Sequence, residues 1–350
     1  MKEITLLKST SGYIALLIFL AVLLVTSILV AVTIGSTSIP IEDVYQVIVN
    51  ELSSQINHSA IRDIIIYIRL PRLILAIAVG MGLAVSGVVM QAVVRNPLAD
   101  PYILGISSGA SLGATSAALL GVGSAFGSNY LGVMGCIGAF AVSMMVLVLS
   151  NIGGRSNSIK LLLSGMALSS LCSAFSSFIV YFADDKEGMM SITYWLMGSL
   201  AGAEWSVIAV VLPIVFLCTI FLWSQHRILN LMLLGDEVAV TLGTELHRYR
   251  NLFLLISALM IGFIVYASGM IGFVGLIIPH FVRFLVGTDH KKLLPISALA
   301  GALLLVWADV LSRIIIPQNE LPIGILISMV GAPCFIYLMA KKSYGFGGNN

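Results

Sequence analysis

Charged side chains are scarce in this 350-residue sequence: they make up 10% of it, against about 25% in an ordinary soluble domain. Apolar residues reach 59%, and the mean hydropathy is +1.06. Too few polar side chains remain to cover a water-soluble protein of this length, so the composition excludes a soluble enzyme and a disordered chain. The net charge of +2 is too small to indicate nucleic-acid binding. The composition predicts a polytopic membrane protein.

The sequence also lacks the motifs of several enzyme classes. It holds no Gly-Lys pair, hence no P-loop for nucleotide phosphates, and no H-E-x-x-H for a zinc protease. Its four cysteines are far apart and lie in apolar stretches, which is typical of small core residues rather than of disulfides or a metal cluster. We therefore expect this chain to bind no metal and no cofactor of its own.

Long runs without a charged residue predict ten membrane-spanning helices in one all-α domain. A crossing needs about 20 apolar residues. Two runs are long enough for two crossings each, and they divide at 121–129 and at Ser268-Gly269. We expect no cleaved signal peptide, because the first run is longer than a signal h-region. The expected spans are 12–34, 73–94, 102–122, 131–151, 161–182, 205–224, 251–267, 272–287, 293–312 and 321–340.

The distribution of Lys and Arg orients these spans. With the N-terminus inside, the outer side carries only five positive residues, and the rest lie inside. This predicts a multi-pass protein of the cell membrane with both termini in the cytoplasm. The outer segments 35–68 and 184–204 should each carry a short helix, around 41–53 and within 189–203. The five outer residues are Arg62, Arg69, Arg72, Lys186 and Arg313.

One enzymatic pattern does occur. Gly105, Ser107 and Gly109 match G-x-S-x-G, but that motif needs a strand before its helix, and here it opens a membrane helix. Gly105, Gly109 and Gly113 recur every four residues, a spacing that lets two helices approach closely. We therefore expect helix packing at these glycines. An intramembrane enzyme that uses Ser107 is the least favoured reading of the chain.

Several longer motifs follow one another in a single order. They are Arg69–Arg72, Arg95–Pro101 with Leu104–Ala110, Gly235–Ala239 with Leu242-Gly243, Gly272–Leu276 with Pro279-His280 and Arg283, and Ala308-Asp309 with Arg313, Glu320–Gly324 and Gly331–Pro333. Together they closely resemble the FecCD permease family, the membrane subunits of ABC importers for iron-siderophores, haem and cobalamin. The likeness covers roughly residues 60–340.

The resemblance implies a type II ABC importer permease fold with ten transmembrane helices per subunit. It implies two permeases, identical or related, that form the pathway in the lipid membrane, and two ABC ATPase subunits that use ATP and Mg. An extracytoplasmic substrate-binding protein would deliver the cargo. The chain would then be no enzyme: it would move a bulky metal chelate inward by alternating access.

The resemblance also assigns a docking role to three arginines. Arg69, Arg72 and Arg313 would meet acidic residues of the binding protein, since complementary charges at a rim steer association. The alternative is that they anchor the span ends at the headgroups, and that Arg313 pairs with Asp309 four residues earlier.

A second implied site is the inner segment 230–250, which would couple the chain to an ATPase. Two short helices should break at Gly235 and Gly243, and the alternative is a segment that rests on lipid headgroups. An inner gate would lie at Asn157 and Ser158. The coupling residues would be Leu234, Gly235, Asp236, Glu237, Ala239, Leu242 and Gly243.

The chief alternative function is an ion-coupled secondary transporter without an ATPase partner. Such proteins carry ionisable groups deep within their spans. The one candidate here is Asp309, and Arg313 lies near it. We therefore expect a conduit that is driven by partner proteins.

Overall fold

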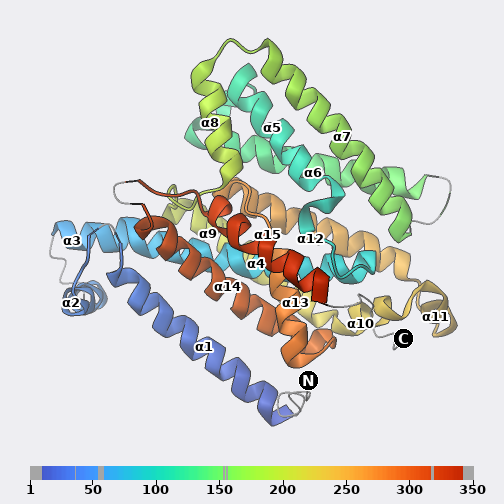
Figure 1. The fold of residues 1–350 in the computed structure, drawn as a ribbon, viewed down its shortest axis with the longest axis horizontal. Helices are drawn as coiled ribbons and strands as arrows, with labels where there is room; N and C mark the ends of the chain where they lie inside the picture. The colour runs from blue at the N-terminus through green and yellow to red at the C-terminus, as the bar shows by residue number, and fades with distance from the viewer. Residues whose placement is uncertain are drawn as a thin grey trace.

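The computed structural model describes residues 10–35, 37–53, 59–152, 154, 157–316 and 319–341, and every regular element in these ranges is helical (Figure 1). The predicted placement of the two termini concerns residues outside this described part. A π turn, η2 (Ile64–Arg69), and two 3₁₀ turns, η3 (Pro101–Leu104) and η4 (Ser124–Asn129), complete the element list. The helices are α1 (Thr10–Thr33), α2 (Ile41–Leu52), α3 (Ala60–Asp63), α4 (Leu70–Val94), α5 (Ile106–Leu120), α6 (Tyr130–Asn151), α7 (Ser158–Phe182), α8 (Lys186–Met197), α9 (Trp205–Ser224), α10 (His226–Leu234), α11 (Asp236–Thr241), α12 (Leu246–Ser268), α13 (Val274–Val286), α14 (His290–Ile314) and α15 (Ile323–Lys341).

Several of these helices are long and apolar enough to span a bilayer. Seven qualify by length and composition, and each of the ten predicted spans overlaps one helix. The helices α5 and α13 and the apolar part of α15 are shorter. The 15 residues of α5 rise only about 22 Å, less than the hydrocarbon core of about 30 Å. The chain is thus a multi-pass membrane protein, and the count of ten crossings stays a prediction.

Helix α4 lies in the middle of the bundle (Figure 1). In its spanning stretch 83% of the residues are buried, against 11% in the peripheral α1. Its glycines touch the backbones of neighbouring helices. A Cβ atom at Gly80 would lie 2.2 Å from the carbonyl oxygen of Gly301 in α14, and one at Gly87 would lie 1.9 Å from that of Gly275 in α13. The core is therefore built by direct backbone contact along α4.

The glycines of α5 lie against α6. A Cβ atom at Gly109 would lie 2.4 Å from the carbonyl oxygen of Gly138, and one at Gly113 would lie 2.1 Å from that of Met134. Gly105 precedes α5 with φ +80°, and a Cβ atom there would meet Val142 at 2.9 Å. The four-residue spacing thus places two glycines where α5 and α6 are closest.

The segment before α4 differs from the sequence-based expectation. The predicted short helix around 41–53 is confirmed as α2, but residues 60–69 are also helical and run into α4 through the π turn η2. Proline lacks the N–H that an α-helix interior needs, yet Pro71 lies inside this continuous helical segment. The wide π turn ends two residues before Pro71, and the helical segment begins at Ala60.

The second predicted short helix, within 189–203, is α8. It begins at Lys186 because the side chain of Asp185 accepts a hydrogen bond from the backbone N–H of Gly188. It ends at Gly198, whose φ is +72°. The helices α2 and α3 lie at one end of the molecule, and α10 and α11 lie at the opposite end (Figure 1). We call these ends the α2 end and the α11 end.

The close contact between α5 and α6 predicts that a change from glycine to alanine lowers the thermal stability at Gly113 but not at Gly202. Gly113→Ala gains about 0.5–1 kcal/mol in helix propensity, but its Cβ clash with a carbonyl should cost about 1–3 kcal/mol. Gly202→Ala meets nothing within 4 Å and has no positive φ. Thermal unfolding in detergent should show a lower midpoint for Gly113→Ala and an unchanged one for Gly202→Ala. Equal midpoints would show that the two helices are not packed this closely.

Candidate functional site

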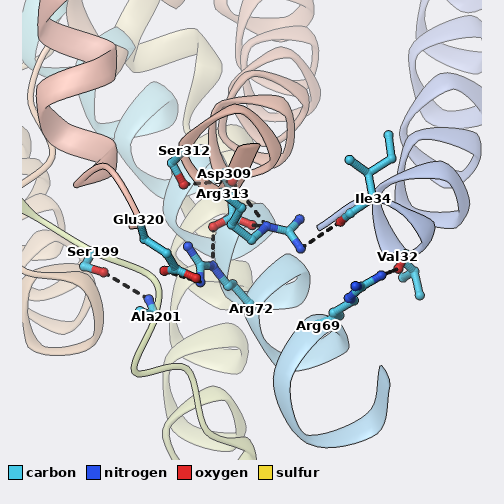
Figure 2. Close-up of polar contacts among 10 residues, drawn as sticks. All are labelled: Val32, Ile34, Arg69, Arg72, Ser199, Ala201, Asp309, Ser312, Arg313 and Glu320. Atoms are coloured by element: carbon cyan, nitrogen blue, oxygen red, sulfur yellow. Dashed lines mark hydrogen bonds and ion pairs between the residues drawn. The ribbon is translucent and has the colours of Figure 1, made fainter. Parts of the chain in front are cut away.

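A cluster of five charged residues lies at the α2 end: Arg69, Arg72, Asp309, Arg313 and Glu320, here called the arginine cluster (Figure 2). Asp309 is 0% exposed, and its Oδ1 accepts a hydrogen bond of 2.5 Å from Nε of Arg72. Its Oδ2 lies 3.2 Å from Nε of Arg313. A buried carboxylate thus sits between two guanidinium groups. Removing one partner from such a pair costs about 3–5 kcal/mol, so the cluster ties α4 firmly to α14.

Glu320 extends this cluster to the segment before α15. Its carboxylate accepts two hydrogen bonds from Nη1 of Arg72, at 2.9 and 2.7 Å. The side chain of Glu320 is 50% exposed, whereas that of Arg72 is 6% exposed. This pairing is not predicted by the sequence, since the two residues are 248 positions apart and no local pattern links them.

The other two arginines hold the end of α1. Nη1 of Arg69 donates to the carbonyl of Val32 at 2.5 Å, and its Nη2 donates to the carbonyl of Thr37. Nη1 of Arg313 donates to the carbonyl of Ile34 at 3.1 Å. The carbonyls that end a helix lack intrahelical partners and carry partial negative charge, so cations suit this place.

The three arginines with a predicted docking role are therefore buried, at 3%, 5% and 9% exposure for Arg69, Arg72 and Arg313. All three bond within the chain, and the alternative pair of Arg313 with Asp309 is present. Their predicted contact with a binding protein stays a prediction. In this conformation Arg72 already bonds two carboxylates, those of Asp309 and Glu320, and of the two that of Glu320 is the exposed one.

At the α11 end, the segment 230–250 comprises the end of α10, all of α11 and the start of α12. Gly235 separates α10 from α11 with φ +97°, and Gly243 follows α11 with φ +76°. Both breaks fall at the glycines that the sequence analysis named. Four large apolar side chains of this segment face outward: Leu234, Val238, Val240 and Leu242, at 58%, 43%, 59% and 64% exposure. We call them the α11 patch.

Two predicted coupling residues contact the rest of the protein. Ala239 is 0% exposed, because it is on the side of α11 that faces the protein. Asp236 is the first residue of α11, and Gly235 is its N-cap. Oδ1 of Asp236 accepts a hydrogen bond of 2.7 Å from the buried Arg250 of α12. Glu237, in contrast, is exposed.

Helix α10 is fixed to the start of α14 by Asn230. Its Nδ2 donates to Oδ1 of Asp289 at 2.8 Å, and its Oδ1 accepts from the backbone N–H of His290 at 2.9 Å. Burial acts to raise the pKa of Asp289, but the hydrogen bonds from Asn230 and from the N–H of Lys291 outweigh it, so the pKa lies below its usual value. Asp289 thus stays ionised, and both short helices are held by charged contacts.

The predicted gate residues lie at the start of α7. Asn157 is the N-cap, and its Oδ1 accepts a hydrogen bond of 2.8 Å from the N–H of Lys160. Ser158 donates through its hydroxyl to the carbonyl of Val93, in the last turn of α4, at 3.1 Å. The gate role itself stays a prediction.

A cavity of about 900 Å³ lies between α5, α7 and α8 on one side and α13 and α15 on the other. Its walls are mostly apolar, with serines and Asp100 as polar groups. Ser107 lines it and donates to the thioether of Met270 at 3.7 Å, which is a weak interaction. A 3₁₀ turn and not a strand precedes α5, so the hydrolase context that G-x-S-x-G requires is missing. Among the described residues, no group of three or more His, Cys, Asp or Glu side chains could hold a metal ion.

Comparison with known proteins gives the chain clear relatives. The model of the FecCD transport family matches residues 22–341. The hemin transport system permease protein HmuU of Yersinia pestis is 39% identical over 93% of this chain and 95% of its own length. The vitamin B12 import system permease protein BtuC of Salmonella typhi is 39% identical over 79% of this chain and 83% of its own. A solved inward-facing transporter, provisionally assigned to the metal-chelate type of ABC transporter, matches with a TM-score of 0.81 at 35% identity, covering 93% of this chain and 99% of that one.

Proposed function

The chain belongs to the FecCD transport family, and from that premise we propose that it is the permease subunit of an ABC importer. Its cargo is a bulky metal chelate: an iron-siderophore, haem or cobalamin. The proposed class draws on relatives named for hemin and vitamin B12 and on the metal-chelate type of transporter. The chain binds no cofactor, and the partner ATPases use ATP and Mg. The α11 end faces the cytoplasm and the α2 end faces outward.

The observation that carries the proposal is the α11 patch. Four large apolar side chains stand exposed on a segment that Asp236, Arg250 and Asn230 hold in place. An exposed apolar cluster on a fixed support is typical of a protein–protein contact. We infer that a cleft of the ATPase receives this patch and that ATP binding moves it.

The alternative position for this segment is on lipid headgroups. Cytoplasmic membrane surfaces carry negative charge and attract Lys and Arg. The first turn of α11 instead carries Asp236 and Glu237, and Arg250 is buried against Asp236. The charge of α11 therefore supports a protein partner over a membrane surface.

The cavity supports a pathway shared with a second permease. One wall belongs to α15, whose Met329 and Val330 are 69% and 68% exposed. A second subunit, identical or related, would close the open side against such residues. Alternating access would then change how the two subunits enclose this space.

The rival function, ion-coupled secondary transport, has weak support in the described residues. Asp309 is the carboxylate buried within a span, and two arginines already neutralise it. A carboxylate held between two guanidinium groups is a poor site for a transported cation, since binding would require breaking both contacts.

A binding protein would dock at the α2 end. Because Arg72 is already occupied by Glu320, we propose that an acidic residue of the binding protein competes with Glu320 for the guanidinium of Arg72. Arg69 and Arg313 would then support the surface indirectly, by fixing the end of α1.

The ATPase contact is tested by placing charge on the α11 patch. The double variant Val240→Asp and Leu242→Asp would bury two carboxylates in an apolar contact and should weaken ATPase binding roughly a hundredfold, about 3 kcal/mol. Copurification of the ATPase and ATP-driven uptake are the readouts. Val49→Asp on the exposed face of α2, at the other end of the molecule, is the matched control and should keep the ATPase bound. Normal copurification of the double variant would favour the headgroup position.

The docking proposal predicts a gain from Glu320→Gln. This change frees Arg72, so the binding protein should associate about two- to tenfold faster at low salt, with a smaller gain at high salt. Surface plasmon resonance on the reconstituted permease measures the rate. Glu204→Gln removes an exposed carboxylate that lies outside the arginine cluster and controls for the change in surface charge. Equal rates for the two variants would leave Arg72 with a structural role alone.

A further inference from the structure

The last turn of α4 has a backbone conformation that its sequence would not lead one to expect. Arg95 follows α4 with φ +56° and ψ +36°, and among the described residues it is one of two non-glycine residues with positive φ. Its N–H donates to the carbonyl of Ala92, and that of Asn96 donates to Gln91. These bonds form a Schellman motif, where glycine is the preferred residue because it adopts this conformation without strain.

The side chain of Arg95 reaches the segment 230–250, which the proposed function makes the coupling segment. A Cβ atom at Gly235 would lie 3.0 Å from Nη1 of Arg95, 3.1 Å from Nη2 and 3.2 Å from Cζ. The guanidinium group therefore lies against the backbone that joins α10 to α11. A cation at this place also suits the C-terminal end of α10, where free carbonyls carry partial negative charge. Gly235 is needed for its φ and for the room that it leaves to Arg95.

The same turn of α4 contacts the start of α7. The carbonyl of Val93, two residues before Arg95, accepts the hydrogen bond of 3.1 Å from the hydroxyl of Ser158. Ser158 is the first residue of α7 and follows its N-cap, Asn157. One helical turn therefore touches the break in the coupling segment on one side and the first turn of a cavity-lining helix on the other.

We propose that Arg95 is a positioning residue that transmits movement of the coupling segment, through the end of α4 and Ser158, to α7. The inference rests on the proposed function, because it requires an ATPase that moves the α11 patch. A strained backbone that carries an arginine, where glycine would be unstrained, indicates that the side chain has a role. The contact with Gly235 shows what that role can act on.

Substitutions at Arg95 separate the side chain from the backbone. Arg95→Gly removes the guanidinium and relaxes the backbone, so the complex should keep its ATPase and be at least as stable to heat. The amount of cargo that this variant complex transports per ATP hydrolysed should fall about fivefold or more, which is the lower range of typical coupling effects. Arg95→Ala should lose the same coupling but should be less stable to heat than Arg95→Gly, because alanine keeps the backbone strain. Arg95→Lys should recover part of the coupling. Lys291→Ala, an exposed cation at the start of α14, should couple normally.

Ser158→Ala tests the second half of the path. It removes the hydrogen bond to Val93 and should lower transport per ATP in the same direction. If the two residues act in one path, the double variant with Arg95→Gly should transport as much cargo per ATP as the more impaired of the two single variants, since coupled sites are not additive. Additive losses would place the two residues in separate roles and overturn the path.

The wild-type complex distinguishes a failure of this inference from a failure of the proposed function. If the wild type with its ATPase imports no chelate on ATP, the proposed function is wrong. If the wild type imports normally and Arg95→Gly transports as much per ATP, only the role of Arg95 is refuted. Loss of ATPase copurification in Arg95→Gly also refutes it, because Arg95 would then shape the ATPase contact itself.

Discussion

Backbone contact along α4 is the constraint on which the rest of the structure depends. Gly80 and Gly87 leave no room for a Cβ atom against α14 and α13, so these helices can lie this close only where side chains are absent. In a membrane, where apolar side chains gain little from leaving lipid, such close packing is a main source of helix association. The tightly held α4 then positions a charged contact at each of its ends: Arg72 in the arginine cluster and Arg95 beside the coupling segment.

The sequence predicted much of this fold because the membrane imposes simple rules on it. Charge-free runs locate the helices, and the glycines at 235 and 243 locate the breaks in the coupling segment. The ends of helices are less predictable than the spans within them. Helix α12 contains the expected span 251–267 but begins at Leu246, since a helix can continue beyond the apolar run through charged residues such as Arg250, which pairs with Asp236. The buried state of the arginine cluster was also beyond prediction, because Arg72 meets partners 237 and 248 residues away.

The two ends of the molecule present different physical surfaces. In the arginine cluster at the α2 end, charge is turned inward: Asp309 is fully buried between arginines, and of the five members only Glu320 is substantially exposed. At the α11 end the reverse holds, because Asp236 and Arg250 fix the segment while apolar side chains face outward. An exposed apolar patch on a fixed segment is typical of a lasting protein contact. In the importer proposed above, these two surfaces would serve two different partners, a binding protein at the α2 end and an ATPase at the α11 end.

Uptake by reconstituted vesicles tests the central claim, that this chain is a permease and that a partner ATPase supplies the energy for transport. The permease would be placed in proteoliposomes with its ATPase and binding protein, and uptake of a labelled ferric siderophore, haem and cobalamin would be followed with the ion gradients collapsed by ionophores. We expect uptake of one of these chelates that requires ATP and the ATPase and persists without any ion gradient. Uptake by the permease alone, driven by an ion gradient and indifferent to ATP, would contradict it.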